Sequence, residues 1–169
     1  MFSLIPDFTA ATVGELTPER LHAAKIDTLL LDFDNTLQAY SQSTMPAQNA
    51  EWIASLQEAG IALCVVSNSK KSRAKDFCNR FHIPLILNAK KPFSRGIRQA
   101  MALFRDRKGI ALVGDQIYTD VLGANLCGLQ SFLVTPIHLS NFWLRLRHAA
   151  ELPCIAIAKR RGCEIEKKL

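Results

Sequence analysis

Two carboxylates stand two residues apart directly after a short apolar run. The run covers residues 28–31, and Asp32 and Asp34 follow it at once, with Thr36 completing a D-x-D-x-T pattern. A run of this kind predicts a buried strand, at whose end carboxylates are costly to remove from water and repel each other. A divalent cation relieves that repulsion, because Mg²⁺ takes oxygen ligands and is usually held by one or two carboxylates. The sequence therefore predicts a buried strand that ends at a Mg²⁺ site.

Short apolar runs alternate with segments of helical periodicity along most of the chain. The runs predict strands at 28–31, 61–66, 85–87, 110–113 and 131–134. The intervening segments predict helices at 46–59, 70–81, 94–104 and 120–127. Continuous apolar strands separated by helices indicate a parallel sheet covered on both faces. We therefore expect an α/β protein with a doubly wound, Rossmann-like parallel sheet, whose ligands bind at the carboxyl ends of the strands.

Length and charge narrow the class of protein. The 169 residues suit a single domain over 1–169, with a basic and aromatic extension from about residue 137. The net charge of +6 favours anionic partners, but no nucleic-acid-binding motif accompanies it. The five cysteines form no C-x-x-C pair, and no signal peptide opens the chain. These features predict reduced thiols and a cytoplasmic protein.

Polar residues suited to phosphate follow two further runs. Ser67 and Asn68 come directly after the run 61–66 and offer a hydroxyl and an amide to a phosphate oxygen. Lys90 and Lys91 precede a proline and the helix 94–104. The residue before a proline is held in an extended conformation, and a fixed ammonium stabilises the charge of a phosphoryl group. We prefer Lys91 to Lys90 for this role because of its place beside the proline.

A second acidic pair follows the run 110–113. Gly114 permits a tight turn, and Asp115 and Asp120 bring two more carboxylates to the predicted strand ends. Each of these signals alone is typical of an ordinary turn or helix cap. Their joint occurrence at successive strand ends favours a functional site.

The set of motifs closely resembles the haloacid dehalogenase-like hydrolase superfamily. That pattern is D-x-D-x-[TV], a Ser or Thr after the second strand, a lysine, and an acidic pair after the fourth. The compact length, the opening at residues 5–7 and the segment 88–92 further resemble the YqeG-type phosphatases of subclass IIIA. These are related to mitochondrial phosphatidylglycerophosphate phosphatases. The resemblance implies a phosphoric monoester hydrolase and makes phosphatidylglycerophosphate the leading substrate.

The resemblance also implies roles for individual residues. Asp32 is the nucleophile that becomes an aspartyl phosphate, and Asp34 exchanges protons with the leaving group and the attacking water. Ser67, assisted by Asn68, binds a phosphoryl oxygen, and Lys91 neutralises charge.

The same resemblance implies a set of metal ligands. Mg²⁺ is expected on Asp32, the backbone carbonyl of Asp34, and Asp115. Asp120 is expected to support the site through water or by orienting other groups.

The spacing of the motifs leaves no room for a cap domain of the kind that many relatives insert. Only residues 38–45 separate the first motif from the next helix, and one helix and one strand occupy 69–90. We therefore expect an open site that suits a bulky phosphate ester, such as a lipid headgroup, a protein or a nucleic-acid end.

The tail suggests a peripheral contact with anionic phospholipid. Phe142, Trp143, Arg145 and Arg147 lie on one predicted helix, which Ser140 and its neighbour would cap, and residues 159–168 are rich in Lys and Arg. The alternative is that the aromatic residues pack back on the sheet.

The opening segment also carries apolar residues that look exposed. They include Leu4, Ile5 and Phe8.

Two other functions fit a doubly wound fold with clustered aspartates. One is a phosphoacceptor module of the receiver type, in which the acidic pair comes early and the phosphorylated aspartate later. The other is a non-catalytic regulatory or scaffold protein. The adjacent D-x-D pattern favours a hydrolase, and so does the presence of all five expected side chains: Asp32, Asp34, Ser67, Lys91 and Asp115. No P-loop pattern occurs, which argues against a P-loop kinase or GTPase.

Overall fold

The computed structural model describes residues 3–39, 42, 44–69, 73–138 and 142–165. Six parallel strands form one sheet in the order β1-β6-β5-β2-β3-β4. The strands are β1 (Phe8–Ala10), β2 (Thr28–Leu31), β3 (Ala62–Val66), β4 (Leu85–Ile86), β5 (Ile110–Gly114) and β6 (Gln130–Val134). The helices are α1 (Pro18–Ala23), α2 (Ala47–Glu58), α3 (Arg73–Phe81), α4 (Ser94–Ala102), α5 (Leu122–Cys127) and α6 (Phe142–Arg160). Two short helical segments are η1 (Val13–Glu15) and η2 (Ile117–Val121).

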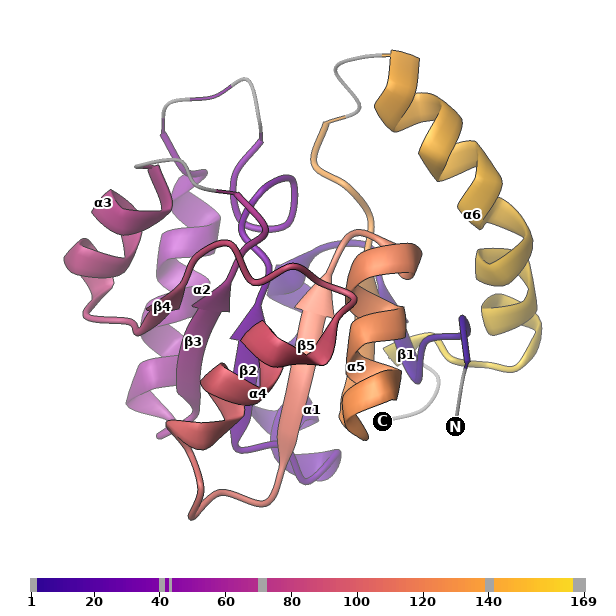
Figure 1. Ribbon diagram of the computed structural model, residues 1–169. Helices are drawn as coiled ribbons and strands as arrows, with labels where there is room; N and C mark the ends of the chain where they lie inside the picture. Colours follow the sequence, from indigo (N-terminus) through magenta and orange to yellow (C-terminus); the bar gives the residue numbers. More distant parts are fainter. Residues whose placement is uncertain (1–2, 40–41, 43, 70–72, 139–141, 166–169) are drawn as a thin grey trace.

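The sheet has an apolar layer on each face, as the alternation of side chains along β2 requires. Leu29 and Leu31 pack among apolar residues of α1, α2 and α3, and Leu30 packs among those of α4 and α5. Figure 1 shows α4 and α5 in front of the sheet and α1 and α2 behind it. The predicted α/β, doubly wound parallel sheet is confirmed. In the described parts of 32–46 and 67–91, the only helix is α3 and the only strand is β4, so no cap domain occurs there.

The edge strand β1 was not among the predicted strands. Phe8, which looked exposed in the sequence, is buried and stacks on Phe132 of β6 with ring centroids 4.6 Å apart. The expectation of an exposed Phe8 was therefore wrong. Asp7 fixes the register of this edge, because Ser131 donates to its carboxylate from both N–H and Oγ at 2.9 Å. A three-residue strand is too short to show alternation, and its partner lies far along the chain.

One helix was missed, and the predicted start of another falls outside the described residues. Helix α1 was missed, although Pro18 stands at its first position and the Thr17 hydroxyl accepts a hydrogen bond from the N–H of Arg20. Helix α3 is described from Arg73, so the predicted beginning at residue 70 lies outside the described residues.

The C-terminal helix α6 packs against the sheet through its middle and its end. Glu151 is buried and accepts a hydrogen bond from the N–H of Ile117 at 3.0 Å. Cys154 and Ile155 pack on an apolar cluster that includes Leu133. The predicted cap at residues 140–141 and the side chains of residues 142–144 and 147 lie outside the described part.

After α6 the chain returns to the sheet edge. The N–H of Thr9 donates to the carbonyl of Cys163 at 2.7 Å, and Glu164 forms a parallel bridge beside Thr9. Among the described residues, no helix is both long and apolar enough to cross a membrane.

Candidate active site

Three neighbouring strands bring the predicted site residues to one edge of the sheet. Asp32 and Asp34 follow β2, Ser67 follows β3, and Asp115 follows β5. Since β2 pairs with β3 on one side and with β5 on the other, these residues leave the sheet side by side. Lys91 arrives from the loop before α4, so four separate segments of the chain build one site.

The loop after β2 is shaped by its two intervening residues. Phe33, between the two aspartates, is buried in the core and contacts Phe77 of α3 with ring centroids 5.5 Å apart. Asn35 has a φ of 65°, in the left-handed region that asparagine tolerates better than most residues. Its N–H donates to the carbonyl of Gln38 at 2.7 Å. The D-x-D-x-T segment is thus fixed in the core and turned sharply at its end.

Lys91 lies at the centre of the site. Its Nζ is 2.7 Å from a carboxylate oxygen of Asp32 and 2.7 Å from one of Asp120, and its side chain is 1% exposed. Asn68 holds the backbone of this lysine at both ends: its Oδ1 accepts from the Lys91 N–H at 2.7 Å, and its Nδ2 donates to the Lys91 carbonyl at 3.0 Å. Lys90 is exposed, so of the two candidate lysines only Lys91 reaches the carboxylates.

Three buried carboxylates form a cluster that could hold a metal ion. Asp32, Asp115 and Asp120 each place one oxygen within 4.8 Å of the others. The hydroxyl of Thr36 lies 3.4 Å from Asp32 and 3.3 Å from Asp115, in position to donate to either. A Cβ at Gly114 would overlap the side chain of Asp120, so the close approach of that aspartate requires glycine here. Asp120 is therefore a member of this carboxylate cluster, together with Asp32 and Asp115.

The carboxylate of Asp34 lies outside this cluster and pairs with Arg73. The distance from Arg73 Nη2 to Asp34 Oδ1 is 2.6 Å. The Nη1 of the same guanidinium donates to the carbonyls of Ala39 and Gln42, at 3.0 Å and 2.9 Å. One arginine at the start of α3 therefore fixes both Asp34 and the loop that follows it. Arg73 was not predicted as a site residue, because it lies 39 residues from Asp34 and belongs to no local pattern.

Ser67 is buried at the end of β3. Its Oγ accepts a hydrogen bond from the N–H of Ser69 at 3.0 Å. A hydroxyl also carries one hydrogen to donate, so Ser67 retains a donor for a bound group.

Burial and charge set the protonation of the central pair. Burial raises the pKa of Asp32 to about 6; Lys91 opposes the rise, and the nearby carboxylates of Asp120 and Asp34 add to it. Burial alone would lower the pKa of Lys91, but the carboxylates of Asp120 and Asp32 outweigh it and raise the pKa above its ordinary value. Lys91 is therefore a permanent cation, and Asp32 ionises near neutral pH.

This fold and this set of side chains define the class. Aspartates after the first central strand, a serine after the next, a buried lysine and a late acidic pair, all at the carboxyl edge of a parallel sheet, are those of a haloacid dehalogenase-like phosphatase.

Comparison with known proteins identifies the family. A profile of the family described as "Mitochondrial PGP phosphatase" matches residues 2–138. The "Probable phosphatase YqeG" of Bacillus subtilis (strain 168) is 31% identical over 160 residues, which cover 94% of this chain and 93% of that protein. The chain belongs to this phosphatase family.

Solved structures share the fold. The 3-deoxy-D-manno-octulosonate 8-phosphate phosphatase of Yersinia pestis superposes with a TM-score of 0.52 at 14% identity, over 87% of each chain. The hypothetical protein XCC2798 of Xanthomonas campestris gives a TM-score of 0.52 at 15% identity, over 86% of this chain and 87% of that one. The family assignment identifies the chain as an enzyme rather than a phosphoacceptor module of the receiver type or a non-catalytic scaffold.

The raised pKa of Asp32 predicts how the stability of the metal-free protein depends on pH. The folded pKa of about 6 lies above the ordinary 3.8, so the stabilising contribution of the protonated carboxyl is complete below about pH 4 and is lost as the pH rises through 6. Asp32→Asn cannot ionise. Its free energy of unfolding relative to wild type should therefore rise by on the order of 2 kcal/mol between about pH 4 and 6, then level off. Urea unfolding in EDTA measures this, and a difference that stays flat across the range contradicts it.

Proposed function

We propose that this phosphatase is a Mg²⁺-dependent phosphomonoester hydrolase that acts through an aspartyl phosphate on Asp32. The observation that carries the proposal is the contact of the buried Lys91 ammonium with Asp32 inside a cluster of carboxylates. An ammonium so placed stabilises an anionic nucleophile and the phosphoryl group that this nucleophile receives.

The carboxylate cluster fits a divalent cation. Asp32, Asp115 and Asp120 are buried, offer hard oxygen ligands and lie close enough together to share one ion. When bound, Mg²⁺ supplies positive charge that lowers the repulsion between an anionic nucleophile and a phosphate ester. The backbone carbonyl of Asp34 remains the further ligand that the family resemblance suggests.

The proposed reaction has two displacements. An oxygen of Asp32 attacks phosphorus, a new O–P bond forms, and the bond from phosphorus to the leaving oxygen breaks while Asp34 gives that oxygen a proton. Water then attacks phosphorus and gives a proton to Asp34, the bond from phosphorus to the Asp32 oxygen breaks, and inorganic phosphate leaves with Asp32 restored. Lys91 neutralises charge throughout, and the Ser67 hydroxyl donates to a phosphoryl oxygen.

Asn68 acts in this proposal through Lys91 rather than on the phosphate. Its amide oxygen and nitrogen are both used by the backbone of Lys91. Its role is therefore to position the backbone of Lys91 so that the ammonium reaches the carboxylates of Asp32 and Asp120.

Removing the nucleophile or the metal should abolish turnover. Asp32→Asn keeps the shape of the side chain but removes its charge, so hydrolysis of p-nitrophenyl phosphate should fall by at least about 10³-fold. EDTA should have a similar effect, reversed by Mg²⁺. The control is Asp76→Asn, the same change at an exposed position of α3, which should leave the rate within about twofold. Full turnover by Asp32→Asn, or in EDTA, contradicts the mechanism.

Arg73 is proposed as the residue that positions Asp34. Arg73→Ala should lower kcat by about 10²-fold with little change in KM, because it frees the proton-transfer group without touching the phosphate. Arg73→Lys should restore part of the rate, and Arg80→Ala on the same helix is the matched control. An equal loss in Arg73→Ala and Arg80→Ala would assign the effect to helix stability instead.

The family resemblance makes phosphatidylglycerophosphate the first substrate to test. The described residues contain no cap over the site, and an open site suits a phosphate on a large molecule. A panel that includes this lipid, phosphopeptides and nucleic-acid ends would rank the substrates by kcat/KM.

A peripheral contact with anionic phospholipid is a second proposal, carried by the outer face of α6. Leu146 and Ile157 are 50% and 41% exposed, and residues eleven apart lie on the same face of a helix. Arg145 and Arg160 are exposed near this stripe, in the arrangement of an interfacial helix.

Vesicle co-sedimentation tests this contact. Binding is expected to vesicles with phosphatidylglycerol at low salt and not to pure phosphatidylcholine. Leu146→Glu should weaken it several-fold. Leu103→Glu, at an equally exposed site on α4's end, should not. No sedimentation with anionic vesicles rules the contact out.

A further inference from the structure

The loop after β5 carries two members of the carboxylate cluster, and its backbone is anchored between them. Asp115 and Asp120 both belong to the cluster, and Ile117, which lies between them in the chain, is buried. The N–H of Ile117 donates to the carboxyl group of Glu151 on α6 at 3.0 Å. A residue of the C-terminal helix, 34 positions further along the chain, thus holds the backbone between two of the clustered aspartates.

The start of η2 is held by two carboxyl groups. The first N–H groups of a helix have no acceptor in a preceding turn, so they need partners from elsewhere. The N–H of Gln116 donates to Oδ2 of Asp120 at 3.2 Å, and the next N–H along the chain, that of Ile117, donates to Glu151. The other oxygen of Asp120 lies 2.7 Å from Lys91 Nζ. Two adjacent backbone groups and Asp120 therefore link Glu151 to the central lysine.

Helix α6 and η2 also pack together around this hydrogen bond. The hydroxyl of Tyr118 in η2 donates to the carbonyl of Ala150 at 3.3 Å. Cys154 and Ile155 of α6 pack on the apolar cluster that contains Ile117. The contact of Glu151 with η2 is thus part of an interface and does not stand alone.

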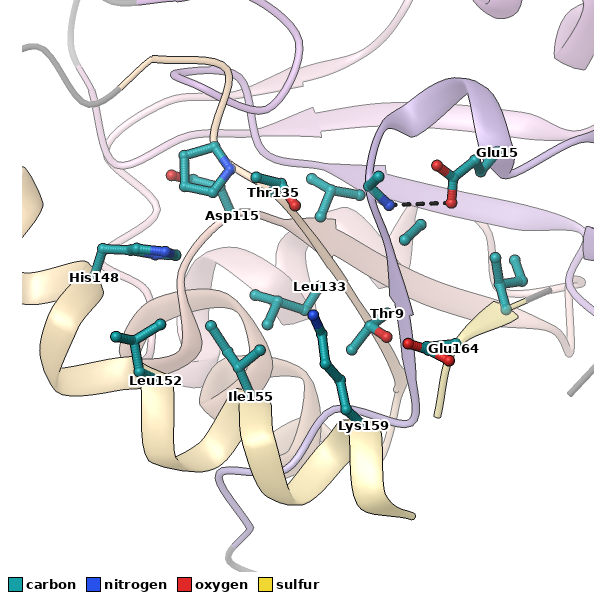
Figure 2. Close-up of a pocket in the computed structure, with 15 residues that line it drawn as sticks. Thr9, Glu15, Asp115, Leu133, Thr135, His148, Leu152, Ile155, Lys159 and Glu164 are labelled. Carbon is teal, nitrogen blue, oxygen red and sulfur yellow. Dashed lines mark hydrogen bonds between the residues drawn. The ribbon is translucent and has the colours of Figure 1, made fainter. Parts of the chain in front are cut away.

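The burial of Glu151 is specific to its own side chain. Its exposed fraction is 1%, whereas that of the next residue, Leu152, is 50%. Leu152 lines a groove of about 530 Å³ between α6 and the ends of β1 and β6, and Asp115 lines one end of this groove (Figure 2). Removing a carboxyl group from water costs free energy unless hydrogen bonds satisfy it. A buried glutamate at this turn therefore indicates a polar contact that the packing of the helix alone does not need.

We propose that Glu151 is a positioning residue that sets the affinity of the carboxylate cluster for Mg²⁺, and that α6 is thereby part of the active centre. The inference rests on the proposed Mg²⁺-dependent reaction. Because Glu151 fixes the backbone between Asp115 and Asp120, these two carboxylates stay close together although like charges repel. Removing a group that orients metal ligands typically lowers metal affinity about 10–100-fold.

Calorimetric titration with Mg²⁺ alone tests this role. Glu151→Ala removes the acceptor and should raise the Kd for Mg²⁺ at least about tenfold. Glu151→Leu should do the same while filling the space, which limits the cost of a cavity. Glu151→Gln keeps an oxygen that can accept from Ile117 and should stay within about threefold of wild type. Wild-type affinity in both the Ala and the Leu variant would overturn the proposal.

Asp7 offers a matched control away from the carboxyl edge of the sheet. Its carboxylate accepts from the N–H of Ser131 at 2.9 Å, near the beginning of β6, much as Glu151 accepts from Ile117. Asp7→Ala should therefore lower the free energy of unfolding, measured in urea, but leave the Kd for Mg²⁺ within about twofold. An equal rise of the Kd in Asp7→Ala and Glu151→Ala would assign the effect to stability and overturn the positioning role.

Amide exchange in the wild-type protein tests the same coupling without a variant. Linkage is reciprocal, so bound Mg²⁺ should stabilise the hydrogen bond from Ile117 to Glu151 as much as that bond stabilises bound Mg²⁺. The Ile117 amide should exchange at least about tenfold more slowly with Mg²⁺ than in EDTA, after division by the change at the Ser131 amide, which reports general stabilisation. Equal slowing at both amides contradicts the coupling.

The calorimetric experiment also separates this inference from the reaction. Mg²⁺ binding that depends on Glu151, in a protein that hydrolyses no ester, would support the positioning role and overturn the reaction alone. Mg²⁺-dependent hydrolysis, with an unchanged Kd for Mg²⁺ in Glu151→Ala and Glu151→Leu, would overturn the positioning role alone. Absence of Mg²⁺ binding in wild type would overturn both.

Discussion

The ion pairs of Lys91 organise the whole carboxyl edge of the sheet. A buried ammonium or carboxylate without a partner is strongly destabilising, so Lys91 requires these carboxylates, and Asp32 and Asp120, which repel each other, each require Lys91. They come from three segments: the end of β2, the loop before α4, and η2. Asn68 holds the lysine backbone from a fourth segment, the end of β3. The requirement to satisfy one buried charge therefore fixes how four loops are placed relative to one another.

The sequence predicted those features of the fold and the site that depend on residues close together in the chain. The central strands were recognised because each is a continuous apolar run. Asp32, Ser67 and Asp115 were recognised because each comes at the end of such a run, and Lys91 because a proline follows it. β1 was missed because its stability comes from Phe132 and Ser131, more than a hundred residues away. Arg73 was missed for the same reason: only the folded chain shows that the first turn of α3 lies against Asp34. Local pattern thus predicted the positions of the groups, and tertiary contact decided their partners.

The C-terminal helix is joined to the acidic loop by one buried group. Glu151 of α6 accepts from the N–H of Ile117, and η2, which begins at Ile117, carries Asp120. Helix α6 therefore contacts the same segment that pairs with Lys91, while its other residues line the groove that starts at Asp115. The sequence offered two alternatives for this tail, membrane contact or packing on the sheet. From Glu151 onward the helix packs, and its outer stripe of Leu146 and Ile157 still faces solvent.

The pairing of β1 with β6 has a consequence for the order in which the protein folds during synthesis. β1 leaves the ribosome more than a hundred residues before its partner strand, which begins at Gln130, and its outer neighbour is Glu164. Phe8 and its neighbours must remain without their partners until β6 has been made. Contacts this distant in sequence are slow to form and leave apolar residues open to non-native association meanwhile. Once these contacts form, Cys163 and Glu164 cover part of the edge of β1. A second chain is then less able to pair with this edge as an added strand.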